Sequence, residues 1–497
     1  MNCKTLLTAA GSLVAVAAFS QNQRPNILFC IADDASMWTF GTYGYEFSKT
    51  PAIDALAENG VRFDNAFTPN PKSAPSRAML VTGKYSWQLK EATNHYCHFP
   101  SEFKFYPSLL QESGYHVGYT GKGWGPGVYD SKDNPAGPVY NDITNEVPYK
   151  GIRNVDYSAN FNAFLDEKES DEPFCFWFGT LEPHRFYEKD SWKKAGYDLA
   201  EAKVQPFLPD NDITRGDFLD YLAEVEWLDT HIGKAVESLR ERGLLENTII
   251  VVTSDHGMPF PRIKGQIYEE GFHVPFIVSW QGVTEPGRVV TDFIGFPDVA
   301  PTFMEAAGLE PHEQMTGRSF LDVLKSKKSG QVDKSRDHML ICKERHDVGR
   351  ASENVTDLAY PVRAIRTADY LYIHNIKPEL WPVGNPEYDY KNCDPSPSKS
   401  YLTSLQPEDS DYEYFVRAFG KRQEEELYDI QNDPHCMNNL ADNLAYAKTK
   451  SKLRKQMEKE LIESGDPRML GEGEQFDKYP YMGKQFDYSK KVEVTNW

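Results

Sequence analysis

The sequence contains few cysteines and histidines, and its cysteines are scattered. Of 497 residues, seven are cysteine and twelve are histidine, and no CxxC spacing occurs. This pattern argues against a zinc site built from closely spaced thiolates. One or two disulfide bonds remain open, but the spacing indicates no particular pair.

Basic residues are also in the minority. The chain has 54 Lys and Arg against 74 Asp and Glu, which gives a net charge of −20 and a pI near 5.1. Such a surface does not attract nucleic acids or anionic membranes as a whole. We therefore expect no nucleic-acid partner, and an anionic substrate would need a local basic pocket.

Long apolar runs are missing except at the start of the chain. Thr5–Phe19 is apolar, follows Lys4 and ends among small residues, which predicts a signal peptide over residues 1–20. Cys3 precedes this run, which argues against a lipoprotein cleavage site. No other stretch is long enough to span a bilayer. We therefore expect a periplasmic or secreted protein without a membrane span.

The rest of the chain alternates between apolar runs and helix-like segments. This alternation predicts a layered α/β domain over residues 21–359. Expected buried parallel strands are 26–31, 116–120, 174–178, 248–253 and 274–280, and expected helices are 51–60, 107–114 and 217–243. From residue 360 onward, two short strands at 362–366 and 370–375, a Pro- and Tyr-rich loop and a charged helix near 444–464 predict a smaller α+β domain.

Four of the expected strands are followed by charged groups, and ligands of open α/β sheets bind beyond the carboxyl ends of strands. The segments are Asp33-Asp34, Gly121-Lys122, Glu182-Pro183-His184-Arg185 and Ser254-Asp255-His256-Gly257. Asp33, Asp34 and Asp255, with His256 beside them, suit calcium or magnesium. Taken alone, adjacent aspartates are as readily helix caps or turn residues.

Basic residues near the same predicted edge complete a candidate anion pocket. Arg77, Lys122, Arg185 and Lys264 would surround a divalent cation there, and His184 could act as a general acid. Each of these residues taken singly has a plainer reading, as a solvated surface cation or a structural histidine.

Residues 73–83 form the most specific motif in the chain. They read Ser-Ala-Pro-Ser-Arg-Ala-Met-Leu-Val-Thr-Gly. This segment resembles the signature of the type I sulfatases of the alkaline-phosphatase-like superfamily, which is Cys or Ser, any residue, Pro-Ser-Arg and a spaced Thr-Gly. Further blocks that resemble this family are 24–28, 33–34, 50–57, 65–68, 121–122, 183–184, 254–257, 264–265, 426–429, 433–434 and 439–440.

The resemblance implies a fold and a modified residue. The fold is a large mixed sheet sandwiched by helices, with a smaller C-terminal α+β subdomain (residues 360–497) that carries a short antiparallel sheet. Ser73 would be oxidised to formylglycine by an anaerobic sulfatase-maturing enzyme, and Ser76 and Arg77 would belong to the recognition sequence. In the hydrated aldehyde, one oxygen attacks sulfur, and the other later expels sulfate.

The resemblance also assigns roles to the residues found above. It implies Ca²⁺ bound by Asp33, Asp34, Asp255, His256 and the modified Ser73. It implies that Arg77, Lys122 and Lys264 surround the sulfate oxygens and that His184 protonates the leaving group.

One position departs from the family pattern. Many relatives read Gly-Lys-x-His after the second strand, whereas this chain has Trp124 at the histidine position. Trp124 either stacks on a sugar face or packs in the core. Arg185, Arg345 and His346 are further predicted sugar contacts.

The substrate prediction is a sulfated glycan of the glycosaminoglycan or mucin type. Residues 257–261, 360–363 and 372–375 resemble the N-sulfoglucosamine sulfohydrolase (heparan N-sulfatase) branch, and an O-sulfatase acting on galactose or N-acetylgalactosamine is the alternative. Two hypotheses from different classes are a phosphodiesterase or phosphonate hydrolase of the same superfamily and a non-catalytic glycan-binding protein. The twelve histidines are few for a two-metal hydrolase.

Overall fold

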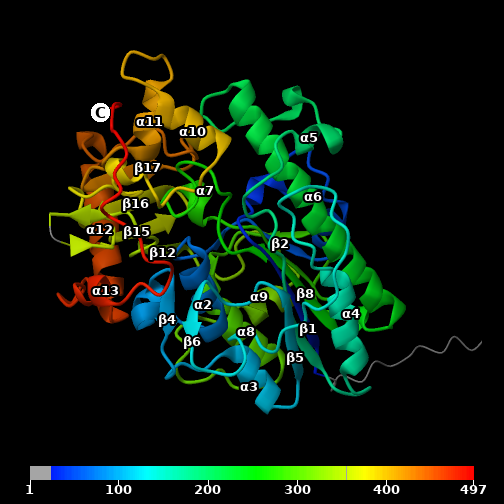
Figure 1. Cartoon of the computed structure of the whole chain (residues 1–497). Helices are drawn as coiled ribbons and strands as arrows, with labels where there is room; N and C mark the ends of the chain where they lie inside the picture. Colours follow the sequence, from blue (N-terminus) through cyan, green and yellow to red (C-terminus); the bar gives the residue numbers. More distant parts are fainter. Residues whose placement is uncertain (1–23, 354) are drawn as a thin grey trace, which may run out of the picture.

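The computed structural model describes residues 24–353 and 355–497 and has a seven-stranded mixed sheet at its centre (Figure 1). The predicted signal peptide lies outside the described residues. The strand order is β10-β2-β9-β8-β1-β7-β5. The strands are β1 (Asn26–Ala32), β2 (Val61–Phe63), β5 (His116–Gly121), β7 (Phe174–Gly179), β8 (Thr248–Ser254), β9 (Phe276–Ser279) and β10 (Arg288–Val290).

Side chains of the central strand β1 enter two separate cores, one on each face of the sheet. Leu28 and Cys30 pack with α4 (Tyr157–Glu167) and α6 (Asp212–Glu241). Ile27, Phe29 and Ile31 pack with helices on the opposite face. Those helices are α2 (Ser73–Thr82), α3 (Tyr106–Glu112), α8 (Val299–Ala306) and α9 (Leu321–Lys325). Because both faces are covered, the central strands β1 and β8 are buried along their whole length, and the predicted sandwich of helices around a sheet is confirmed.

The predicted direction of one strand is wrong. β1, β5, β7 and β8 are parallel, but β9 is antiparallel to β8 and to β2. The chain between β8 and β9 contains only the short helix α7 (Glu269–Phe272), which cannot return the chain across a face of the sheet. The segment instead stays at the carboxyl end of β8, and β9 re-enters the sheet from that end.

A second, antiparallel sheet lies in the C-terminal part of the chain, in the order β12-β15-β16-β17. Its strands are β12 (His338–Lys343), β15 (Val362–Thr367), β16 (Tyr370–Asn375) and β17 (Glu425–Asp429). One face packs on α12 (Ala447–Glu463) and the other on Phe67 and Phe272 of the larger domain. β12 precedes residue 360, so this sheet draws on both predicted domains, and the boundary itself stays a prediction.

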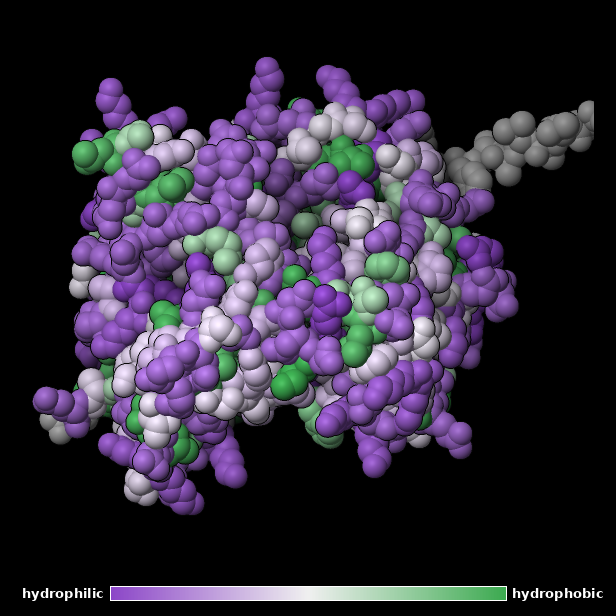
Figure 2. Space-filling view, turned by 90° about the horizontal axis from the view of Figure 1, so that it is seen from above, coloured by the Kyte–Doolittle hydropathy of each residue, from purple (hydrophilic) through white to green (hydrophobic). Residues whose placement is uncertain are grey.

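The remaining elements are short. They are α1 (Pro51–Glu58), α5 (Ser191–Lys194), α10 (Pro397–Ser404), α11 (Tyr412–Phe419), α13 (Gln475–Lys478), β3 (Ala66–Phe67), β4 (Cys97–Phe99), β6 (Gly127–Tyr129), β11 (Ile294–Gly295), β13 (Ala351–Ser352) and β14 (Val355–Thr356). In the described part of the chain, six cysteines are unpaired and buried, and no helix is both long and apolar enough to cross a membrane. Figure 2 shows a mainly hydrophilic face with scattered apolar residues.

A buried ion-pair network closes the C-terminal sheet against the segment after α12. Arg363 Nε lies 2.6 Å from Asp466 Oδ2, and its Nη2 lies 2.9 Å from Glu344 Oε1, with all three side chains fully buried. Arg363→Leu would leave two carboxylates buried without this cation. We expect a loss of about 3–5 kcal/mol in the free energy of unfolding, measured by urea denaturation.

The exposed pair of Arg240 with Glu237 provides the control for this prediction. Arg240→Leu should change stability by no more than about 0.5 kcal/mol, because both partners are solvated. Equal effects of the two substitutions would contradict the assigned role of Arg363.

Candidate active site

Ser73 is the first residue of α2, and the amino end of this helix faces the carboxyl edge of the large sheet. Lys72 before it is extended, Pro75 lies in the first turn, and Gly83 ends the helix with a left-handed backbone. Every residue of α2 is buried, and Ser73 is only 2% exposed. The free N–H groups of the first turn favour an anion close to Ser73.

The charged groups that follow the four parallel strands meet at this edge. The register pairs Ile31 and Gly121 with Gly179, and Ala32 with Ser254, so the strands end at the same level. The left-handed Gly121 lets β5 turn closely against β7, because a Cβ there would lie 1.9 Å from the Gly179 carbonyl oxygen.

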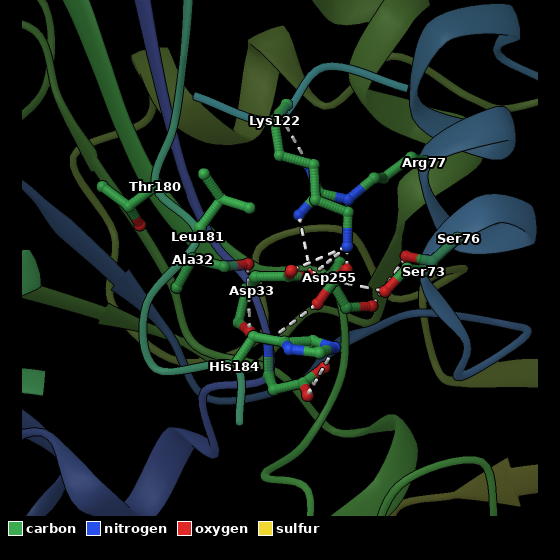
Figure 3. A network of polar contacts seen from close by, with 12 residues as sticks. Ala32, Asp33, Ser73, Ser76, Arg77, Lys122, Thr180, Leu181, His184 and Asp255 are labelled. Carbon is green, nitrogen blue, oxygen red and sulfur yellow. Dashed lines mark hydrogen bonds and ion pairs between the residues drawn. The ribbon is translucent and has the colours of Figure 1, made fainter. Parts of the chain in front are cut away.

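Asp33 lies at the centre of the resulting network. Lys122 Nζ donates to both of its carboxylate oxygens at 2.6 and 2.7 Å, and Arg77 Nη2 donates to Oδ1 at 3.3 Å. Arg77 Nε also donates to Asp255 Oδ2 at 3.1 Å. Figure 3 shows Lys122 and Arg77 on one side of the two carboxylates, His184 on the other and Ser73 beside them. Burial opposes ionisation of Asp33, but Lys122, His184 and Arg77 hold its pKa well below its usual range.

Asp34, Asp255 and His256 form a buried group able to hold a metal ion, with one ligand atom of each within 4.8 Å of the others. Asp34 Oδ1 is buried without a hydrogen-bond partner in the described structure, and the His256 Nε2 atom lies 3.2 Å from it. His256 Nδ1 lies 3.0 Å from the Gly257 carbonyl oxygen and donates to it. The lone pair of Nε2 is therefore free for a cation, and burial lowers the pKa of His256, which favours the neutral ligand form.

Ser73 lies between these two groups. Ser73 Oγ is 3.3 Å from Asp33 Oδ1 and 3.3 Å from His256 Nε2. Ser76 Oγ donates to the Asp255 backbone carbonyl at 2.6 Å, which ties the first turn of α2 to the end of β8. A group at position 73 thus lies next to a possible metal ligand and next to the carboxylate to which Lys122 and Arg77 donate.

The formal charges of the site also favour a cation. Three buried or half-buried cations face four carboxylates, which leaves an excess of one negative charge in a desolvated region. They are Arg77, Lys122 and Lys264 against Asp33, Asp34, Asp255 and Asp394. A divalent cation would make the sum positive, as an anionic substrate requires.

Lys264 connects the metal-binding group to the C-terminal domain. Its Nζ lies 2.6 Å from Asp34 Oδ2 and 2.9 Å from Asp394 Oδ2. Burial opposes the charge of Lys264, but these carboxylates raise its pKa above its ordinary value. The sequence pattern did not identify Asp394, which lies in the Pro- and Tyr-rich loop. His184 Nε2 lies 3.9 Å from Asp34 Oδ2, and Nδ1 donates to the Arg185 carbonyl oxygen, so Nε2 points into the site.

The four predicted sugar contacts have buried positions that the sequence did not reveal. The Trp124 Nε1 atom donates to the Ala74 carbonyl oxygen, and its ring packs edge-on against Phe99. Arg185 forms a bidentate ion pair with Asp217. Arg345 donates to the backbone carbonyls of Tyr479 and Pro480. His346 Nε2 contacts Asn70 Oδ1. Their assignment as sugar contacts stays a prediction.

Comparison with known proteins assigns the class. The chain belongs to the sulfatase family, whose model matches residues 25–309, and residues 262–403 match the C-terminal model described as N-sulphoglucosamine sulphohydrolase. It is therefore a hydrolase of sulfate esters or sulfamates. An "Ulvan-active sulfatase" of Formosa agariphila is 31% identical over 90% of this chain and 81% of the relative. The human N-sulphoglucosamine sulphohydrolase is 27% identical over 94% of this chain and 95% of its own length.

Solved structures share the alkaline-phosphatase-like fold. One, a complex with its substrate D-glucosamine-2-N,6-O-disulfate, is 20% identical and superposes with a TM-score of 0.63 over 89% of this chain and 99% of that chain. The phosphonate monoester hydrolase of Agrobacterium radiobacter is 17% identical, with the same TM-score over 89% and 97% of the two chains. At these identities the likeness shows the fold alone.

Asp34→Asn tests whether the buried group holds a divalent cation. Calcium or magnesium added to metal-stripped protein should raise its melting temperature, since a ligand at 100 times its Kd stabilises by about 2.7 kcal/mol. Asp34→Asn should lose this shift, whereas Asp337→Asn at an exposed, distant aspartate should keep it. An equal shift in all three proteins would place the binding elsewhere, and no shift in the unaltered protein would contradict a cation site.

Proposed function

We propose that this protein releases sulfate from sulfated carbohydrates, with Ser73 converted to formylglycine and Ca²⁺ bound beside it. The observation that carries the proposal is the position of Ser73 Oγ. It lies at a buried helix amino terminus, 3.3 Å from both Asp33 Oδ1 and His256 Nε2. An ordinary buried serine would not need three surrounding cations and four carboxylates.

The residues of the site fit both proposed groups. Asp34, Asp255 and His256, together with Asp33 and the oxygen at position 73, offer the carboxylate-rich donor set that Ca²⁺ accepts, and the cation would polarise the sulfate. A formylglycine hydrate supplies a second hydroxyl, which a serine ester lacks and which is needed to release the sulfate.

The chain's own residues would then bind the anion and move the proton. Lys122 and Arg77 already converge on the carboxylates beside Ser73, and their donors can turn to sulfate oxygens. Lys264 approaches from the opposite side through Asp34. His184 is 36% exposed and directs Nε2 inward, which suits protonation of the leaving oxygen or nitrogen.

The substrate class follows from the relatives taken together. Their names include ulvan-active, N-sulfoglucosamine and N-acetylgalactosamine-6-sulfate enzymes, which all act on sulfated sugars. We propose a sulfated glycan for this chain as well, with an O-sulfate on galactose or N-acetylgalactosamine as the alternative to an N-sulfate. One group of metal-capable side chains was found among the described residues, which favours one cation over the two-metal site of a phosphodiesterase.

Two further proposals concern the export and the maturation of the protein. The apolar N-terminal segment supports export to the periplasm or beyond. Serine at position 73 supports maturation by an anaerobic sulfatase-maturing enzyme. The sequence Ser73-Ala74-Pro75-Ser76-Arg77 is the basis on which we propose that enzyme as a partner.

Sulfate release by a matured protein tests the function. Ser73→Cys, produced with a formylglycine-generating enzyme, should release sulfate from at least one of N-sulfated glucosamine and O-sulfated galactose, N-acetylgalactosamine or N-acetylglucosamine. The matched Ser73→Ala protein should be at least about 10³-fold slower, because it cannot carry the aldehyde. A confirmed aldehyde without sulfate release from any sugar or aryl sulfate would contradict the proposal, as would faster hydrolysis of a phosphonate ester.

His184→Ala tests the assignment of the general acid. A sugar alkoxide or amine is a poor leaving group, so its release should slow by about 10²–10⁴-fold. Nitrophenyl sulfate has a good leaving group and should slow much less. An equal loss on both substrates would instead assign His184 to sulfate binding.

A further inference from the structure

Two partly exposed carboxylates from the C-terminal half of the chain lie beside buried lysines of the site. The side chains of Asp347, after β12, and Asp394, before α10, are 21% and 24% exposed. Each faces a cation that is almost completely buried. Asp394 Oδ2 lies 2.9 Å from Lys264 Nζ, and Asp347 Oδ2 lies 3.7 Å from Lys72 Nζ.

Both carboxylates lie close to the reacting position. Lys72 immediately precedes Ser73, and Lys264 also binds Asp34. Burial raises the pKa of Asp347. Lys72 lowers this pKa, and Asp394 raises it further by charge repulsion between the two carboxylates. Burial also opposes ionisation of Asp394, but Lys264, Lys72 and His184 lower its pKa. The two acidic groups therefore lie next to the lysine that precedes Ser73 and the lysine that binds Asp34.

The neighbours of Asp347 leave polar atoms available to a ligand. The Tyr481 hydroxyl donates to Asp347 Oδ1 at 3.0 Å, and His95 Nδ1 lies 3.9 Å from Oδ2, beyond hydrogen-bond distance. His95 is buried, and its Nδ1 has no hydrogen-bond partner in the described structure. Such an orphaned buried atom beside a free carboxylate oxygen is costly unless a ligand or water binds there.

The chemistry of this cluster matches a sugar ring. Carboxylates and an imidazole accept hydrogen bonds from hydroxyl groups, which are the groups a sugar presents in every direction. The rings of Tyr96 and Tyr481 pack against each other at 5.2 Å beside Asp347, and both are half-buried. Their apolar faces complete a surface that is polar at one end and apolar at the other, as sugar sites commonly are.

The two carboxylates are balanced by the two lysines that they face, so the cluster can accept hydrogen bonds from hydroxyl groups without an unpaired buried charge. A sugar with free hydroxyl groups next to the cleaved sulfate fits this cluster.

We propose that Asp347 and Asp394, with His95, form the subsite that binds the sulfated sugar through its free hydroxyl groups. This inference rests on the proposed function and names the residues that set its substrate preference. Asp347 is the residue to test, because it contacts none of the proposed metal or sulfate ligands, whereas Asp394 forms an ion pair with Lys264.

The experiment compares a sugar substrate with a substrate that has no sugar. We would measure kcat/KM of the formylglycine form on nitrophenyl sulfate and on the faster of N-sulfated glucosamine and 6-O-sulfated N-acetylglucosamine. Asp347→Asn should lower the sugar-to-aryl ratio by about 10–100-fold, because a charged acceptor is lost.

Two further variants serve as the control and the fallback for this experiment. Asp357→Asn is the matched control, because Tyr488 donates to Asp357 as Tyr481 donates to Asp347, and its ratio should stay within about twofold of the unaltered value. If Asp347→Asn does not fold, Tyr481→Phe removes the hydroxyl that orients Asp347 and should lower the ratio by about three- to tenfold. An unchanged ratio in the folded variant would overturn the subsite while leaving sulfatase activity intact.

A binding measurement tests the subsite without catalytic turnover. The catalytically inert Ser73→Ala protein should bind the sulfated sugar, and Ser73→Ala with Asp347→Asn should bind it at least about tenfold more weakly by calorimetry. Equal affinities, or no binding of either sugar to Ser73→Ala, would overturn the subsite. If the matured parent protein does not hydrolyse aryl sulfates at all, the proposed function is refuted instead.

Discussion

The mutual neutralisation of buried charges at one sheet edge is the constraint on which the rest of the site depends. Lys122 and Arg77 both donate hydrogen bonds to Asp33 in a region that is shielded from solvent. Charges in such a region are tolerated only when partners hold them in a fixed geometry. The aligned ends of four parallel strands provide that geometry, and the surplus negative charge creates the demand for a cation.

The C-terminal domain is part of this arrangement. Its antiparallel sheet packs on Phe67 and Phe272, close to the segment that carries Lys264. The loop before α10 supplies Asp394, which pairs with Lys264, and the segment after β12 supplies Asp347, which faces Lys72. Under the two proposals, the residues at the edge of the large sheet would bind and cleave the sulfate, and the segments next to the antiparallel sheet would bind the sugar. Variation in the second set would change the substrate without disturbing the first.

Much of this organisation was predictable from the sequence because strand ends are local features. A buried apolar run predicts a strand, and the residue that follows it must lie at the sheet edge, which placed Asp33, Lys122 and Asp255 together. The direction of β9 was not predictable, because the pattern of a buried strand is the same in both directions. Asp347 and Asp394 were missed since their positions depend on packing between domains. Trp124 was ambiguous for a similar reason: its partners Ala74 and Phe99 are distant in sequence.

The central claim is that Ser73 is the residue whose modified form performs the chemistry. The most direct test is the mass of the peptide containing Ser73 after production of the unaltered chain with an anaerobic sulfatase-maturing enzyme, measured alongside sulfate release. The account predicts loss of two hydrogen atoms from that peptide and a rate of release proportional to the modified fraction. Full activity from a protein in which Ser73 is unmodified would contradict the account.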